Sequence, residues 1–119
     1  MFATAIQPIL DRACVSCHGA DKQKGKLRLD SFAALMKGGD IGPAVQPGRA
    51  ADSELVKRIM FPLAHDDHMP PEGKPQPTAD ELTILKWWVE AGASADRPVA
   101  ELNPGPEVRR ALGAAATQP

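Results

Sequence analysis

The chain has 119 residues, which is enough for one domain with a single small core. Its formal net charge is −1, so no basic excess indicates a nucleic-acid partner and no polybasic run indicates binding to anionic lipid. No apolar run is long enough to cross a bilayer, so we expect no transmembrane segment. Hydrophobic residues make up 43% of the chain but aromatic residues only 4%, which is little aromatic bulk for a core.

The first predicted element is a helix over residues 3–13, because Ile6, Ile9 and Leu10 recur at helical spacing on one face. Proline is tolerated only in the first turn of a helix, so Pro8 suggests that the regular helix starts near residue 7. This helix would deliver the first cysteine of the chain at its C-terminal end.

Cys14 and Cys17 are the two cysteines of the chain, and His18 follows directly. The spacing C-x-x-C-H is the attachment motif of a c-type haem. The two thiols would form thioethers with the two vinyl groups of the porphyrin, and His18 would take one axial position on the iron. A haem would also supply the apolar bulk that the few aromatic residues do not.

Three other interpretations of this motif are open. A structural zinc site needs four cysteine or histidine ligands, and only His65 and His68 are left to complete one. A thioredoxin-like dithiol would need a βαβ unit, which this chain does not predict. A disulfide between the two cysteines would leave His18 unexplained. We therefore favour covalent haem.

Residues 20–30 are predicted to form a polar loop that runs into a short extended piece. Leu27 and Leu29 alternate with charged neighbours, so both side chains point the same way, against a haem face or into the ordinary core. The same stretch carries a basic patch beside the motif, formed by Lys22, Lys24, Lys26 and Arg28. A solvated loop and a docking surface for an acidic redox partner would both account for this patch.

A short second helix is predicted over residues 31–37, with Asp30 as its N-cap and Gly38 at its end. The loop that follows, residues 38–50, contains four glycines and two prolines and cannot be helical. The second ring nitrogen of a ligating histidine is usually held by a hydrogen bond, and a backbone carbonyl near Pro43 could accept it.

A third helix is predicted over residues 53–61, with Asp52 as its N-cap. Arg49 and Arg58 flank this helix. Each could pair with a haem propionate through a bidentate contact, or simply lie exposed on the surface.

Residues 61–77 are predicted to form a second ordered loop, because five prolines lower the entropy lost on ordering. The loop presents three candidate iron ligands, which are His65, His68 and Met69. The stretch from His65 to His68 is polar, and we expect it to face solvent. Pro70 and the proline after it would stiffen the backbone beyond Met69.

The last core helix is predicted over residues 79–91, because Thr78 and Glu81 form a capping box. Its apolar stripe includes Trp88 and is wide enough to lie against both the first helix and a haem edge. From residue 94 onward the composition is that of an Ala/Pro-rich linker or loosely docked tail, with a turn or two of helix over residues 107–114. We expect a domain over residues 1–93 and a tail over 94–119.

The motifs taken together resemble the planctomycete-type cytochrome c domain, a branch of the class I-like monohaem cytochromes. The resemblance covers about residues 2–93 and depends on motifs that occur in order: Ile-x-Pro-Ile-Leu, Cys-x-x-Cys-His-Gly, Lys-Gly-Lys-Leu-Arg-Leu-Asp-Ser, Gly-Gly-Asp-Ile-Gly-Pro-Ala-Val-Gln-Pro-Gly, Ser-Glu-Leu-Val-Lys-Arg-Ile, Met-Pro-Pro-Glu-Gly and Trp-Val-Glu-Ala-Gly-Ala. It implies an all-α cytochrome c fold, with about four short helices and long ordered loops wrapped around one covalent haem c. It also implies His18 as the proximal ligand and Met69 as the distal ligand.

The expected function is electron transfer, since a haem with two protein ligands has no open position for a substrate. The alternatives are a haem-based sensor of small ligands, with a weak distal ligand, and a peroxidase-like enzyme. Covalent haem attachment takes place outside the cytoplasm, so we expect a periplasmic or otherwise exported chain. No signal peptide is visible, which suggests a mature chain or a domain of a longer exported protein. A redox protein or a fused oxidoreductase domain would be the partner.

Overall fold

The computed structural model describes residues 2–14, 27–39, 42–66, 68–70, 73–97 and 99–116. Within these residues the fold is all-α, as predicted, and contains no β-strand beyond a single antiparallel bridge between Gly39 and Gly42. The elements are η1 (Phe2–Ile6), α1 (Gln7–Ala13), α2 (Phe32–Lys37), η3 (Ala50–Asp52), α3 (Glu54–Met60), α4 (Ala79–Glu90), η4 (Val99–Leu102) and α5 (Pro106–Ala116). No helix of the described residues is long and apolar enough to cross a membrane.

The first helix begins as a π-helical turn, η1, and continues without a break as the regular helix α1. Pro8 lies in the first turn of α1, directly after the π-helical turn. The predicted start of the regular helix near residue 7 is therefore confirmed. The N-terminal end of η1 is tied down by a hydrogen bond of 3.2 Å from the Phe2 N–H to the carbonyl oxygen of Ala95.

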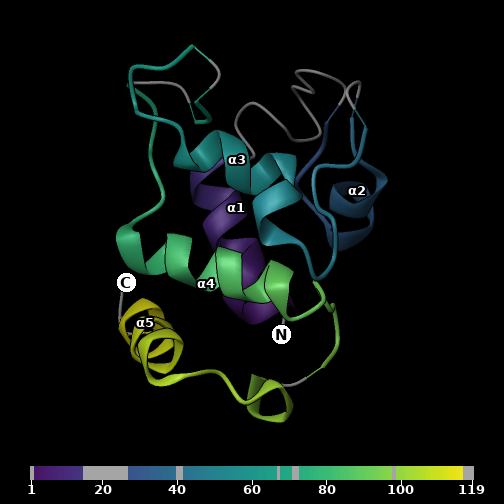
Figure 1. The fold of residues 1–119 in the computed structure, drawn as a ribbon, viewed down its shortest axis with the longest axis vertical. Helices are drawn as coiled ribbons and strands as arrows, with labels where there is room; N and C mark the ends of the chain where they lie inside the picture. The colour runs from purple at the N-terminus through teal and green to yellow at the C-terminus, as the bar shows by residue number, and fades with distance from the viewer. Residues whose placement is uncertain are drawn as a thin grey trace.

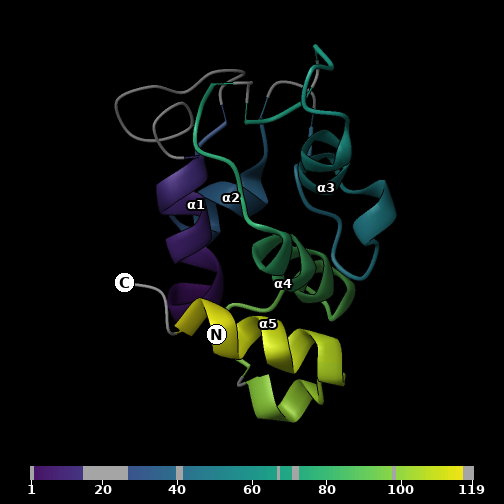
Figure 2. The ribbon, with the colours of Figure 1, turned by 90° about the vertical axis from the view of Figure 1, so that its left-hand side faces the viewer.

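α4 is the central helix of the fold and lies between α3 on one side and α5 on the other (Figures 1 and 2). It begins at the predicted capping box: the Thr78 hydroxyl accepts the Glu81 N–H at 3.1 Å, and the Glu81 carboxylate accepts the Thr78 N–H at 2.8 Å. The same buried carboxylate also pairs with Arg12 of α1. Glu81 therefore starts α4 and joins it to α1.

Three of the chain's five aromatic residues meet at one point of the core. Phe2, Phe32 and Trp88 come from η1, α2 and α4, and their ring centroids lie 5.3, 5.5 and 6.4 Å apart. Edge-on and tilted aromatic pairs add about 0.5–1.5 kcal/mol each beyond the area that they bury. The scarce aromatic side chains are thus concentrated where three elements join.

Two predicted helix caps are wrong by one residue. Ser31, and not Asp30, caps α2, because its hydroxyl accepts the Ala34 N–H at 3.1 Å while Asp30 is paired with Arg28. Ser53, and not Asp52, is the N-cap residue of α3. The Ser53 hydroxyl makes no cap bond; it is buried, accepts the Gln46 N–H at 2.8 Å and donates to the carbonyl oxygen of Arg49 at 3.0 Å.

The C-terminal helix is longer than the predicted turn or two. α5 spans Pro106–Ala116 and packs on α4, and its Ala111 has no exposed surface. Burial explains the extra length of α5, because a helix with one apolar edge is stabilised more by a neighbouring helix than by its intrinsic helix propensity. The predicted domain boundary near residue 94 stays a prediction.

Candidate haem site

The described segments next to the C-x-x-C-H motif and the Met69 segment lie at one end of the fold. Figure 2 shows the C-terminal end of α1, the segment that leads into α2 and the segment that follows α3 together at the upper end. Cys14 is the C-cap residue of α1; it is 9% exposed, and its N–H donates to the carbonyl oxygen of Leu10 at 2.8 Å. Cys17 and His18 lie outside the described residues.

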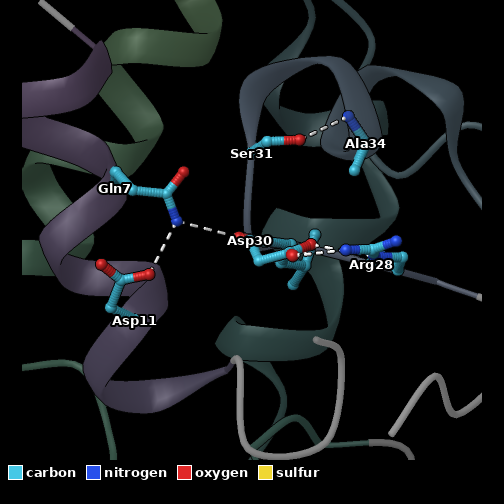
Figure 3. A network of polar contacts seen from close by, with 7 residues as sticks. Gln7, Asp11, Arg28, Asp30, Ser31 and Ala34 are labelled. Atoms are coloured by element: carbon cyan, nitrogen blue, oxygen red, sulfur yellow. Dashed lines mark hydrogen bonds and ion pairs between the residues drawn. The ribbon is translucent and has the colours of Figure 1, made fainter. Parts of the chain in front are cut away.

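Gln7 of α1 is hydrogen bonded to the chain just after residues 15–26. Its side-chain amide donates to the carbonyl oxygen of Leu29 at 3.0 Å and to the Asp11 carboxylate at 2.9 Å (Figure 3). Leu29 is 2% exposed, and Leu27 is partly buried against the core. Both ends of the stretch that carries Cys17 and His18 are therefore tied to α1. Cys14 is the C-cap residue of this helix, and Leu29 is hydrogen bonded to its Gln7.

Arg28 and Asp30 form an ion pair beside this contact. The Arg28 guanidinium donates to both carboxylate oxygens of Asp30, at 3.1 and 2.6 Å (Figure 3). These hydrogen bonds and the positive charge hold the pKa of Asp30 below its usual range, and the carboxylate raises the pKa of Arg28. Asp30 thus balances the charge of Arg28 within the predicted basic patch, while the three lysines of the patch lie outside the described residues.

The prediction that His65 to His68 faces solvent is wrong for His68. His65 and Asp66 are exposed, and the His65 ring stacks on Phe61 with centroids 4.4 Å apart. His68 is only 6% exposed: its Nδ1 lies 2.8 Å from the carbonyl oxygen of Phe61, and its Nε2 lies 2.8 Å from Oε1 of Gln76. Both partners are oxygen acceptors, so a neutral ring donates to one of them and a charged ring donates to both. Asp67 lies outside the described residues.

These two contacts bear on the choice of iron ligand. A histidine nitrogen that binds a metal must present its lone pair to the metal, and both ring nitrogens of His68 are directed at oxygen atoms. Met69, the next residue, is partly buried, and its N–H donates to the carbonyl oxygen of Arg58 at 3.1 Å. Its side chain carries the soft thioether that haem iron accepts as an axial ligand.

The remaining predicted site residues already have protein partners or lie exposed. Arg49 pairs with Asp52 at 2.7 Å, Arg58 pairs with Glu54 at 3.3 Å, and Pro43 is exposed. Trp88 lies in the aromatic cluster, and its indole N–H donates to the carbonyl oxygen of Ser94 at 2.9 Å. Contacts of these four residues with a haem stay predictions.

Sequence reasoning missed Gln76. Its side-chain nitrogen donates to the carbonyl oxygen of Pro70 at 2.8 Å and to that of Lys74 at 3.2 Å, while its oxygen faces His68. Nothing in the sequence marks this residue, because it stands alone between two prolines and belongs to no motif. Only the folded loop brings it to His68.

The residues of this end of the fold fit a haem better than a zinc ion. Cys14 supplies a buried thiol, Met69 a thioether and Leu27 a partly buried apolar side chain, while Leu29 is already buried in the core. The zinc alternative would draw its four ligands from Cys14, Cys17, His18, His65 and His68, and of these His68 already has both ring nitrogens directed at protein oxygen atoms. One imidazole and one thioether, by contrast, suffice for haem iron.

Comparison with known proteins gives one family. A family model described as Planctomycete cytochrome C matches residues 14–73, which is half of the chain and includes both the C-x-x-C-H motif and Met69. No curated protein and no solved structure matches the chain. The chain therefore belongs to the planctomycete cytochrome c family, a family of haem-binding, electron-transfer proteins.

Proposed function

We propose that this chain carries electrons with one covalently bound haem c, attached through Cys14 and Cys17 and ligated by His18 and Met69. The observation that carries the proposal is the engagement of both ring nitrogens of His68. Met69, the next residue, is then the partly buried candidate ligand of this loop. The family match covers both Met69 and the attachment motif.

When bound, a haem supplies an iron that takes up and gives back one electron. The residues of this chain decide whether that iron carries electrons or meets a substrate. The His18 imidazole and the Met69 thioether would occupy both axial positions, so neither oxygen nor peroxide has a vacant position. A His/Met ligand pair also raises the reduction potential, and the apolar side chains of Leu27 and Leu29 would keep water away.

The partner and the compartment belong to the same proposal. Because covalent haem attachment takes place outside the cytoplasm, we propose that the chain acts in the periplasm or another exported compartment. Its electrons would pass to or from a separate redox protein or a fused oxidoreductase domain. The full reading frame around residues 1–119 tests this point: an export signal and a neighbouring oxidoreductase domain would support it.

The experiment that tests the axial ligand is spectral. A His/Met haem shows a weak ferric charge-transfer band at the red edge of the visible spectrum. Met69→Ala should abolish this band, lower the reduction potential and open the ferrous iron to carbon monoxide. His65→Ala is the matched control and should leave all three properties unchanged.

Two results would contradict the proposal. The first is a wild-type protein without the band whose native spectrum is changed by His65→Ala and not by Met69→Ala, which would make His65 the ligand. The second is a wild-type protein that binds carbon monoxide readily, which would favour the sensor function.

A further inference from the structure

We infer that His68 and Gln76 are positioning residues that hold Met69 in place as the iron ligand. This inference rests on the proposed function, because it concerns the same axial position. Neither side chain would touch the iron. The His68 ring anchors the residue before Met69 to Phe61 and Gln76, and Gln76 donates to the carbonyl oxygen of Pro70, the residue after Met69.

Residues 68–70 are anchored at two places, the C-terminal end of α3 and the side chain of Gln76. The imidazole of His68 reaches the carbonyl oxygen of Phe61 at 2.8 Å, just past the end of α3. The Met69 N–H donates to the carbonyl oxygen of Arg58 in α3 at 3.1 Å. The carbonyl oxygen of Pro70 accepts the side-chain amide of Gln76 at 2.8 Å.

Gln76 closes this arrangement from the other side of the loop. Its amide nitrogen faces the carbonyl oxygens of Pro70 and Lys74, and its amide oxygen faces Nε2 of His68 at 2.8 Å. The one side chain therefore bridges the residue before Met69 and the residue after it. A glutamine is suited to this task because it offers a donor and an acceptor at the end of one side chain.

Burial makes these contacts costly to break. His68 is 6% exposed, and Pro70 is buried. If the Met69 backbone moved away from the iron, the His68 ring and the Pro70 carbonyl would lose their hydrogen-bond partners in a buried place. Buried polar groups without partners are destabilising. The arrangement should therefore keep Met69 on the iron against competing ligands. It also explains why a polar histidine is buried next to the ligand.

The test removes the bridge and measures how easily Met69 is displaced. Gln76→Leu keeps the size of the side chain but loses both the donor and the acceptor. Imidazole should bind ferric Gln76→Leu about tenfold more tightly than the wild type, which corresponds to about 1.4 kcal/mol, the scale of one net hydrogen bond. The red-edge band should weaken, and the reduction potential should fall.

The matched control is Gln46→Leu. Gln46 is also a partly buried glutamine in a loop, but its side chain donates to the carbonyl oxygen of Asp52 at 3.3 Å, away from the Met69 segment. This variant should bind imidazole as the wild type does. If Gln76→Leu does not accumulate as holoprotein, Gln76→Glu provides the test, since it keeps an oxygen toward His68 but cannot donate to Pro70 and Lys74.

A double-mutant cycle with His68→Phe measures the coupling. If the two residues act as one unit, the double variant should bind imidazole little more tightly than either single variant. Wild-type affinity for imidazole and an unchanged band in the Gln76 variants would overturn the inference while leaving Met69 as the ligand. A wild-type protein that lacks the band, with a spectrum that Met69→Ala leaves unchanged, would instead overturn the proposed function.

Discussion

The clearest single-residue interactions lie where the chain returns to α1 after the haem motif. Gln7 holds the Leu29 backbone, and the Arg28–Asp30 pair lies beside this contact (Figure 3). The two charges lie two residues apart, and the Arg28 guanidinium reaches both carboxylate oxygens of Asp30. The pair is partly exposed, so its effect on stability should be small.

Asp30 should make a pH-dependent contribution to stability. Because its pKa is lower in the folded chain, the contribution is present above the unfolded pKa of about 4 and is lost as the pH falls through the folded pKa. Asp30→Asn should therefore lower the unfolding free energy slightly at pH 7 and by less in acid near pH 2. Guanidinium unfolding at both pH values checks this, with the exposed Asp96→Asn as the control. An equal loss at both values would contradict the assignment.

Among the helices, α4 has the most fully specified start. Its capping box satisfies two backbone N–H groups within four residues, and Glu81 adds the pair with Arg12 of α1. Local capping and contact between helices thus depend on the same carboxylate. The start of α2, by comparison, has one hydroxyl cap from Ser31.

Thr78→Ala should lower the unfolding free energy by about 1 kcal/mol, because the Glu81 N–H loses its acceptor. Thr78→Ser should recover most of this loss, since it restores the hydroxyl. Thr83→Ala is the control in the same helix: its hydroxyl donates to the carbonyl oxygen of Ala79, a bond that adds little to helix stability. Denaturant unfolding of the holoproteins measures all three. Equal losses for Thr78→Ala and Thr83→Ala would contradict the role of the cap.

At the scale of the whole molecule, the buried core includes residues of α1, α3 and α4. The C-x-x-C-H motif begins at Cys14, the C-cap residue of α1. This core is stabilised by the aromatic cluster of Phe2, Phe32 and Trp88 and by the contact of α5 with α4. Leu29, which follows the motif, belongs to this core, and Leu27 packs against it. A covalently attached haem would add further apolar contacts at this end.

Holoprotein exported together with a haem-attachment system should therefore keep its haem through acid–acetone extraction, and its mass should exceed that of the apoprotein by one haem. Cys17→Ala should reduce attachment to a single thioether, and Cys14→Ala together with Cys17→Ala should abolish it. Protein made in the cytoplasm without that system should be largely unfolded apoprotein, as circular dichroism would show. Extractable haem in the wild type, or bound zinc, would contradict covalent attachment.

Much of the helical fold follows from local sequence. The capping box at Thr78 and Glu81, the first-turn position of Pro8 and the Gly38 terminator each depend on residues within about one turn, so they were predicted correctly. The C-x-x-C-H motif is local for a chemical reason, since two thiols and an imidazole that bind one haem would have to reach the same porphyrin. The family match over residues 14–73 agrees with that interpretation.

The tertiary structure decided which side chains meet once the loops and helices are folded. His68 is buried because Phe61 and Gln76, seven and eight residues away, meet its two nitrogens. A polar stretch such as residues 65–68 gives no local sign of which side chain will find buried partners. Composition alone likewise did not show that α5 would pack on α4, because that burial exists only once α4 presents a face to receive it.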